Sequence, residues 1–242
     1  MSSLYIIGLG PGNENGMTKA AFNALSKCTL IMGYKTYIKQ VQKIFPDKEY
    51  KDSAMRQEVE RCREAVKEAE NQDVALVCSG DSGVYGMVAL VYEVRENNSD
   101  VDIKIIAGVT AANSGAALVG SPLTNDFAVI SLSDLLTPME VIKKRVEGAS
   151  MGDFCIVLYN PMSKTRRTQL KTACEIMLKY KSSDTVCAIA HAVGREDEWY
   201  KLITLEELKD IEVDMVSTIY IGNTQTRIID NKMITRRGYR GV

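Results

Sequence analysis

The chain has 242 residues, of which 45 % are apolar and 25 % are charged, and its formal net charge is −1. This balance is typical of a globular protein with a substantial core, and it excludes a chain-wide basic surface that would bind duplex nucleic acid. The longest weakly polar stretch, 105–123, contains Pro122 and many small polar residues, so we expect no membrane span.

The six cysteines show neither a CxxC pair nor a spacing with histidine that is typical of a metal site. Most of them lie in apolar runs, which predicts reduced, structural thiols and no metal centre. Met1-Ser2-Ser3 leads directly into an apolar run, without the basic segment of a secretory signal. We therefore expect a cytoplasmic protein.

Apolar runs alternate with helix-like stretches through the first half of the chain. Strands are predicted at Leu4–Leu9, Thr29–Met32, Val74–Cys78, Ile103–Ile106 and Phe127–Ser131, and helices at Thr18–Lys27, Ala54–Glu70 and Val84–Arg95. The helix that begins at Ala54 is rich in strong helix formers and carries apolar residues at helical spacing, at Val59, Cys62, Ala65, Val66 and Ala69. Such alternation predicts an α/β fold with a largely parallel sheet.

The pattern of the second half changes after about Ala190. Helices are predicted at Pro138–Glu147, with Pro138 as the first helical residue, and at Thr165–Tyr180; strands are predicted at Phe154–Tyr159, Thr185–Ala190, Lys201–Thr204, Ser217–Ile221, Arg227–Ile229 and Lys232–Thr235. Turns such as Gly222-Asn223 and Asp230-Asn231 predict hairpins and a partly antiparallel sheet. We therefore expect two α/β lobes, an N-terminal lobe at 1–125 and a C-terminal lobe at 126–242.

The first predicted strand ends in Gly8-Leu9-Gly10-Pro11-Gly12-Asn13. This loop resembles a dinucleotide fingerprint, but Asn13 replaces the third glycine, Pro11 removes an amide, and the second strand ends at Tyr34 without a carboxylate for a ribose. A nucleotide-dependent oxidoreductase is therefore disfavoured. On its own the loop is better explained by the geometry of a tight strand-to-helix turn than by a ligand site.

Two further loops of small residues follow predicted strands, at 78–86 and 107–115. The carboxyl ends of parallel strands are where open α/β sheets bind ligands. These loops carry one carboxylate, Asp81, and no cluster of positive charge. They suit a neutral or cationic adenosyl ligand better than a pyrophosphate, although Asp81 could instead cap its own loop.

Four motifs together resemble the tetrapyrrole (corrin/porphyrin) methylases: Gly8-Leu-Gly-Pro-Gly12, Gly80-Asp-Ser-Gly-Val-Tyr-Gly86, Gly108-Val-Thr-Ala111 and Ser121-Pro-Leu-Thr124. The resemblance spans the whole chain. It implies two α/β lobes of the class III methyltransferase type, with S-adenosylmethionine between them. It also implies a homodimer that acts on a tetrapyrrole.

Five further blocks resemble one branch of this family, the precorrin-3B/cobalt-factor III C-17 methyltransferases: Gly33–Tyr37, Ser131–Pro138, Leu158–Arg166, Gly194–Glu196 and Thr235–Tyr239. The branch implies methylation of C-17 with ring contraction in cobalamin biosynthesis. Two residues depart from the pattern: Met162 stands at a position that is usually basic, and Ser82 stands where the wider family often has proline. The sequence leaves open whether the substrate carries cobalt. It also leaves open a related methyltransferase acting at another carbon, or a non-enzymatic ligand-binding module.

The resemblance carries over to individual residues. It implies cofactor contacts at Pro11, Ser79, Gly80, Asp81, Val84, Thr110, Ala111, Asn160, Ala192 and Thr218. Substrate carboxylates are expected at Lys35, Lys164, Arg166 and Arg195, although the ordinary interpretation of such residues is a solvated surface. For proton transfer we expect His191, the single histidine, with Tyr34 and Glu196 as reserves. A lone histidine is more often structural than catalytic, but the position of His191 at the carboxyl end of a predicted strand makes the two roles about equally expected.

Overall fold

The structure is a computed structural model, and it describes residues 2–95 and 100–241. The chain divides into two compact units, Met1–Ser114 and Gly115–Val242, and the division falls within helix α5 (Ala111–Val119). Each unit has its own sheet and its own core. The lobe bounds expected from the sequence, 1–125 and 126–242, stay a prediction.

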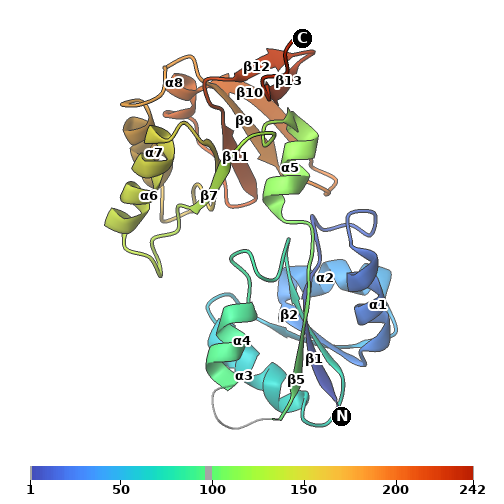
Figure 1. The fold of residues 1–242 in the computed structure, drawn as a ribbon. Coiled ribbons are helices and arrows are strands. Elements are labelled where there is room, and N and C mark those ends of the chain that lie inside the picture. The colour runs from blue at the N-terminus through green and yellow to red at the C-terminus, as the bar shows by residue number, and fades with distance from the viewer. Residues whose placement is uncertain (1, 96–99, 242) are drawn as a thin grey trace. The chain divides into compact units, whose positions relative to one another are not determined.

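The first unit is built on a five-stranded sheet in which every pairing is parallel, in the order β3-β2-β4-β1-β5. Its strands are β1 (Ser3–Gly8), β2 (Leu30–Tyr34), β3 (Glu49–Ser53), β4 (Val74–Cys78) and β5 (Asp102–Ile106). Its helices are α1 (Lys19–Lys27), α2 (Lys35–Ile44), α3 (Glu58–Glu68) and α4 (Val88–Arg95), and Figure 1 shows α1 and α2 on one face of the sheet and α3 and α4 on the other.

Alternation along β1 explains why helices cover both faces. Leu4 and Ile6 pack into the core under α3 and α4, whereas Tyr5 and Ile7 pack into a second core under α1 and α2. Since successive side chains of a strand point to opposite faces, a strand that is apolar throughout must be buried on both sides. The predicted parallel α/β arrangement of this half is confirmed.

Several bounds in the first unit differ from the prediction. Helix α3 begins at Glu58 and not at Ala54, and Val59, expected on its buried face, is 37 % exposed. Strand β3 was not predicted, because it is an edge strand of sequence EYKDS with no fully buried residue. Helix α2 was also missed, because Ile38 and Val41 are its only buried residues.

The second unit holds a mixed sheet in the order β10-β9-β11-β8-β7. Its strands are β7 (Phe127–Ser131), β8 (Cys155–Tyr159), β9 (Val186–His191), β10 (Trp199–Thr204) and β11 (Ser217–Ile221). A smaller sheet has the order β12 (Thr226–Ile229), β13 (Lys232–Thr235), β6 (Gly120–Ser121), and the remaining helices are α6 (Met139–Met151), α7 (Gln169–Met177) and α8 (Leu205–Leu208). The pairings make β7, β8 and β9 run in one direction and β10 and β11 in the other.

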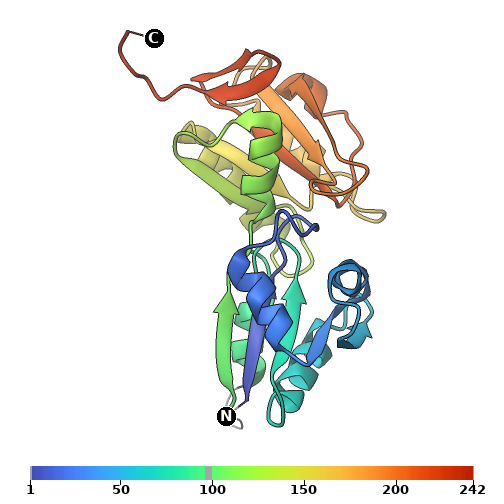
Figure 2. The same cartoon turned by 90° about the vertical axis from the view of Figure 1, so that its right-hand side faces the viewer.

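Helices α6, α7 and α8 cover one face of the mixed sheet, where their apolar residues form one core with Ile156, Ile189 and Ile219. Helix α5 lies on the opposite face (Figure 2). A Cβ atom added at Gly115 would lie 3.2 Å from the Cβ of Ala190, so the absent side chain lets this helix approach the sheet closely. Pro138 precedes α6 as its N-cap and is not its first helical residue.

The antiparallel character expected after Ala190 is confirmed, but only one of the two turns makes a hairpin. β12 and β13 pair around Asp230 and Asn231, whose φ angles of 49° and 56° are those of a tight left-handed turn. The turn at Gly222-Asn223 instead carries the chain from the mixed sheet to the smaller one. None of the described helices is long and apolar enough to cross a membrane.

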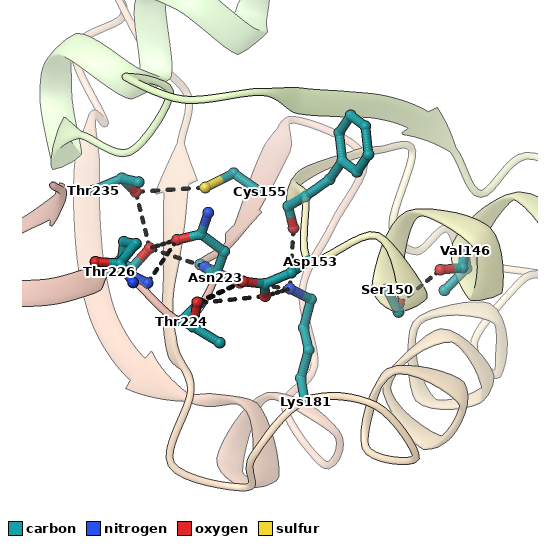
Figure 3. Close-up of polar contacts among 12 residues, drawn as sticks. Val146, Ser150, Asp153, Cys155, Lys181, Asn223, Thr224, Thr226 and Thr235 are labelled. Carbon is teal, nitrogen blue, oxygen red and sulfur yellow. Dashed lines mark hydrogen bonds and ion pairs between the residues drawn. The ribbon is translucent and has the colours of Figure 1, made fainter. Parts of the chain in front are cut away.

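A buried lysine ties together three segments of the second unit (Figure 3). The Lys181 ammonium donates to the carbonyl oxygens of Phe154 at 3.0 Å and Gly222 at 3.1 Å, and it lies 3.3 Å from an Asp153 carboxylate oxygen. Asp153 also accepts from the hydroxyl of Thr224 at 2.6 Å. Burial alone would raise the pKa of Asp153, but the bonds from Thr224 and the Lys181 charge outweigh it and lower that pKa.

Candidate functional site

The predicted site residues of the first unit lie at one edge of its sheet. β4, β1 and β5 are neighbours and run parallel, so the loops that follow them leave from the same edge. We call the segments 8–18, 79–87 and 107–111 the glycine edge. It contains the following predicted cofactor contacts: Pro11, Ser79, Gly80, Asp81, Val84, Thr110 and Ala111. β2 ends at the same edge with Tyr34, and Lys35 begins α2.

Glycines let the three loops of this edge approach one another at backbone distance. Gly10 and Gly80 exchange two backbone hydrogen bonds of 3.0 and 2.9 Å, with φ angles of 74° and 64°. A Cβ atom at Gly8 would lie 2.6 Å from the Gly80 oxygen and 2.7 Å from the Gly108 nitrogen, distances that no side chain tolerates. These glycines therefore serve the geometry of the loops, and the loops form one continuous backbone surface.

Asp81 joins two of these loops. One of its carboxylate oxygens accepts from the amides of Gly83 at 2.8 Å and Val84 at 3.1 Å, and the other accepts from the amide of Gly108 at 2.9 Å. The loop-capping role left open by the sequence is therefore present. Because a carboxylate offers about four acceptor sites, one remains for a ligand.

Two residues that depart from known patterns have structural roles here. Ser82 is fully buried, and its hydroxyl donates to the Ile106 carbonyl at 3.2 Å. The Asn13 side chain accepts from the Gly16 amide at 2.7 Å, so Asn13 closes a turn where a dinucleotide fold would carry its third glycine. Thr110 begins the turn into α5, since its carbonyl accepts from the amides of Asn113 and Ser114 at 3.0 Å.

The predicted site residues of the second unit also share one edge. β7, β8 and β9 end there, and β10 and β11 begin there. We call the segments 131–137, 159–169, 191–199 and 214–218 the charged edge. It contains the following predicted residues: Asn160, Ala192, Thr218, Lys164, Arg166, Arg195, His191 and Glu196.

Left-handed backbone marks the ends of two strands at this edge. Asn160 and Ala192 have φ angles of 52° and 49°, and Gly194 follows with 77°. The Asn160 amide donates to the Ser131 hydroxyl at 2.9 Å, which ties the ends of β8 and β7 together. Non-glycine residues in this conformation are strained and cluster at functional sites, which fits the predicted contacts at Asn160 and Ala192.

The two remaining cofactor candidates are well covered. Ala192 is 2 % exposed and Thr218 is 7 % exposed. Thr218 is paired with Ala190 and so faces the same side of the sheet as that residue. His191 is paired with Ser217 on the other side, so the side chains of Thr218 and His191 point to opposite faces.

His191 lies in a polar enclosure that was not predicted. Its Nδ1 atom is 3.2 Å from the Ser217 hydroxyl and 3.4 Å from Asp214, and its Nε2 atom is 3.7 Å from Asp197. The Trp199 ring stacks on the imidazole with a centroid distance of 4.9 Å. The register of β10 and β11 against β9 brings these partners together, so no spacing along the sequence could have identified them.

Two arginines of the charged edge have no acidic partner among residues 2–95 and 100–241. Arg166 is 8 % exposed, and its guanidinium makes one long hydrogen bond, of 3.4 Å, to the Leu132 carbonyl. Arg195 is half-buried, and the nearby Glu198 carboxylate instead accepts from the Gly194 amide at 2.7 Å. Arg167, by contrast, pairs with Glu212 in solvent, where the ordinary surface interpretation holds.

The other predicted substrate and reserve residues are more open. Lys35, Lys164 and Glu196 are exposed, and Tyr34 is partly buried with its ring edge-on to Tyr37 at 5.4 Å. In the described parts of the chain, no group of His, Cys, Asp and Glu side chains is arranged to hold a metal ion.

All six cysteines are buried and unpaired. Burial raises the pKa of the thiols of Cys28, Cys62 and Cys174 to about 12 and that of Cys78 to about 11. Thiols of this kind stay protonated near neutral pH and are poor nucleophiles. The prediction of structural cysteines therefore agrees with their surroundings.

Comparison with known proteins agrees with both the motifs and the fold. Residues 3–209 match the family model described as Tetrapyrrole (Corrin/Porphyrin) Methylases. The chain is 43 % identical to a probable cobalt-factor III C(17)-methyltransferase of Methanocaldococcus jannaschii, over 98 % of this chain and 97 % of that protein. It is 42 % identical to a protein of the same name from Salmonella typhimurium, over 98 % of this chain and 99 % of that protein.

Other relatives differ in length or are known as structures. The chain is 40 % identical to a cobalt-factor III methyltransferase of Priestia megaterium over 98 % of its own length, but it spans only 45 % of that protein. The crystal structure of the methyltransferase CobJ superposes with a TM-score of 0.90 at 32 % identity, covering 98 % of this chain and 100 % of that one. The family and branch resemblance seen in the motifs is confirmed by these matches. The chain belongs to the tetrapyrrole (corrin/porphyrin) methylase family.

Proposed function

We propose that this protein is an S-adenosylmethionine-dependent methyltransferase that methylates C-17 of a precorrin-3B or cobalt-factor III tetrapyrrole, with ring contraction, in cobalamin biosynthesis. The observation that carries the proposal is the match over nearly the full length of two probable cobalt-factor III C(17)-methyltransferases, at 42 % and 43 % identity. The glycine edge and the charged edge add chemistry that suits the two ligands of such a reaction.

The glycine edge fits a flat adenosyl ligand with a positive centre. Its loops offer backbone amides and carbonyls where side chains are absent, and Asp81 keeps one free acceptor site beside Gly80. When bound, S-adenosylmethionine supplies the methyl group. The chain orients it through Pro11, Gly80 and Thr110. The demethylated form of this ligand is present in a solved structure of the same fold, a uroporphyrin-III methyltransferase of Thermus thermophilus that is 17 % identical with a TM-score of 0.68.

The charged edge fits a substrate that carries many carboxylates. Arg166 and Arg195 have no acidic partner within the described parts of the chain, and guanidinium groups bind carboxylates through two parallel hydrogen bonds. Lys164 and Lys35 add exposed charges at the ends of β8 and β2. We assign these four side chains to the acetate and propionate groups of the tetrapyrrole.

Ring contraction needs a proton to move near the carbon that leaves the macrocycle. We assign this step to His191, because imidazole is the side chain whose ordinary pKa suits proton transfer near neutral pH. Tyr34 and Glu196 are the alternative candidates for the same proton transfer. Asp214 and Ser217 lie on its Nδ1 side and would hold the ring in one orientation. The same contacts would also hold a structural histidine, and His191→Ala separates the two roles because only loss of a proton-transfer group slows ring contraction.

The test is incubation of the protein and S-adenosylmethionine with metal-free precorrin-3B and, separately, with cobalt-factor III. We expect one of the two to gain a methyl group on C-17 and to contract, as followed by mass and absorption spectra and by NMR of the product. Methylation at another carbon would point to a different member of the family. Binding of S-adenosylmethionine without transfer to either tetrapyrrole would overturn the proposal. Light scattering of the same preparation tests the homodimer that the family resemblance implies.

A further inference from the structure

A buried polar cluster lies where β7 and β8 end, and the proposed reaction does not yet use all of it. Arg166 and Gln169 are 8 % and 9 % exposed. Both reach the segment that follows β7: the Arg166 guanidinium donates to the Leu132 carbonyl at 3.4 Å, and the Gln169 amide donates to an Asp134 carboxylate oxygen at 3.1 Å. The cluster therefore brings a buried cation, Arg166, to the same three-residue stretch, 132–134, that carries the Asp134 carboxylate.

Gln169 is unusual among the buried polar side chains. Its Oε1 atom is the one buried side-chain oxygen or nitrogen that lacks a hydrogen-bond partner within residues 2–95 and 100–241. Reversing the amide would not satisfy it, because the carbonyl oxygen would then face the Asp134 carboxylate, which only accepts. The contact with Asp134 therefore fixes the orientation of Gln169 and leaves its oxygen unpaired.

Asp134 would be the natural partner of Arg166. It stands two residues after the carbonyl that Arg166 contacts, yet no ion pair joins the two side chains, and Gln169 is the group that holds the carboxylate. A buried arginine without a carboxylate is destabilising on its own, and a carboxylate of a ligand would supply the missing partner. An Asp134–Arg166 pair would neutralise that site before a ligand arrived.

We propose that Gln169 is a positioning residue that keeps Asp134 away from Arg166, so that the guanidinium is free to bind a carboxylate of the substrate. This inference rests on the proposed function, since it assigns that carboxylate to the tetrapyrrole. The inference goes beyond the proposed function because it gives a role to Gln169 and Asp134, neither of which contacts the substrate in this scheme. Specificity for a carboxylate group of the substrate then depends on the Gln169 amide, which holds the neighbouring Asp134 carboxylate.

The experiment measures binding of uroporphyrin, a porphyrin with eight carboxylates, by fluorescence quenching. Gln169→Met keeps the length of the side chain but removes the amide, and we expect about tenfold weaker binding, which corresponds to one hydrogen bond to a charged group. Asp134→Asn alone leaves the affinity within about twofold of the original protein. The double variant Gln169→Met with Asp134→Asn regains that affinity, because an amide cannot neutralise Arg166.

Two further variants keep the test decisive. Asp134→Glu places a carboxylate one methylene longer on the same segment, and we expect it to weaken binding like Gln169→Met without changing α7. Gln72→Met is the matched control, because Gln72 also donates to a carboxylate, that of Glu68 at 3.4 Å, but lies in the first unit. Neither this control nor any other variant should change the affinity for S-adenosylmethionine or the thermal unfolding midpoint.

The outcomes separate the inference from the function on which it rests. If the double variant binds uroporphyrin as weakly as Gln169→Met, or if no variant changes the affinity of a protein that does bind it, the role of Gln169 is refuted while the proposed function stands. If the unaltered protein binds S-adenosylmethionine but neither binds uroporphyrin nor methylates a tetrapyrrole, the proposed function itself fails.

Discussion

The glycine edge and the charged edge, which carry the predicted site residues, differ in the chemical groups that form them. The glycine edge is made of backbone: glycines in contact, paired amides and carbonyls, and a carboxylate that is itself held by three amides. The charged edge is made of side chains: the buried Arg166, the enclosed His191, and Asp134, whose carboxylate accepts a hydrogen bond from Gln169. The first edge should therefore tolerate no added atoms, whereas the second should respond to changes of charge.

The largest effect is expected where a side chain is added to the glycine edge. A Cβ atom at Gly108 would lie 2.6 Å from both the carbon and the oxygen of the Gly8 carbonyl, so Gly108→Ala must push two loops apart. We expect a loss of about 3 kcal/mol in the free energy of unfolding of the first unit, measured by urea denaturation.

The matched control for this substitution is Gly148→Ala in α6. Nothing lies within 4 Å of an added Cβ atom there, and alanine is the better helix former. This variant should be as stable as the original protein or slightly more stable. Equal effects of the two substitutions would show that the glycine edge is not tightly packed.

Replacement of His191 tests whether the charged edge takes part in the chemical reaction. His191→Ala should slow formation of the ring-contracted product by about 10²-fold, as for a lost acid–base group, and leave binding of S-adenosylmethionine unchanged. The measurement is single-turnover absorption spectroscopy together with calorimetric binding. Contracted product at the original rate would reduce His191 to a structural residue held by Trp199 and Asp214.

Substitution of Lys181, the lysine shown in Figure 3, tests whether buried side-chain contacts stabilise the second unit. Lys181→Met should lower the free energy of unfolding by about 2 kcal/mol, because the carbonyls of Phe154 and Gly222 lose their buried donor. Lys27→Met is the comparison in the first unit: that lysine contacts Asp73 and the Tyr5 hydroxyl, but its side chain is 60 % exposed, so its loss should change stability much less. Similar losses for both would contradict the contrast between the two units.

A smaller effect is expected at Asp81, because its contacts are shared among three amides. Asp81→Ala should weaken binding of S-adenosylmethionine about tenfold, the loss typical of one interaction with a charged group. Calorimetry on the variant and on Asp47→Ala, which removes an exposed acid, makes the comparison. If Asp81→Ala and Gly80→Val both bind the cofactor normally, the cofactor site lies elsewhere.

The smallest effect concerns pH. The pKa of Asp153 is lowered below its ordinary value of 3.8 in the folded chain, so this group stabilises the fold above that pH and its contribution is lost as the pH falls through the lower, folded value. The difference in unfolding free energy between the original protein and Asp153→Asn should therefore shrink as the pH falls below 3.8. Asp184→Asn, at an exposed position, is the control. A difference that does not change with pH would exclude this linkage.

The long apolar strands and the family were within reach of the sequence, because both depend on local pattern. β4, β7, β11 and β13 have the bounds that were predicted, and each lies in a run whose composition favours a strand. Edge elements such as β3 carry charged residues, so their pairing with β2 has no signal in composition. The starts of α3 and α4 were placed too early, because propensity does not reveal where a loop ends.

What the sequence by itself determined is the set of motifs, the alternation of strands and helices, and which residue types stand at the ends of the strands. Only the tertiary structure decided which partner each residue has. Strand register brought Trp199 and Ser217 to His191, and the packing of α7 against the end of β7 joined Gln169 to Asp134. These contacts join residues 8 to 35 positions apart through hydrogen bonds and stacking, and local sequence carries no record of them because they exist only once the sheet has formed.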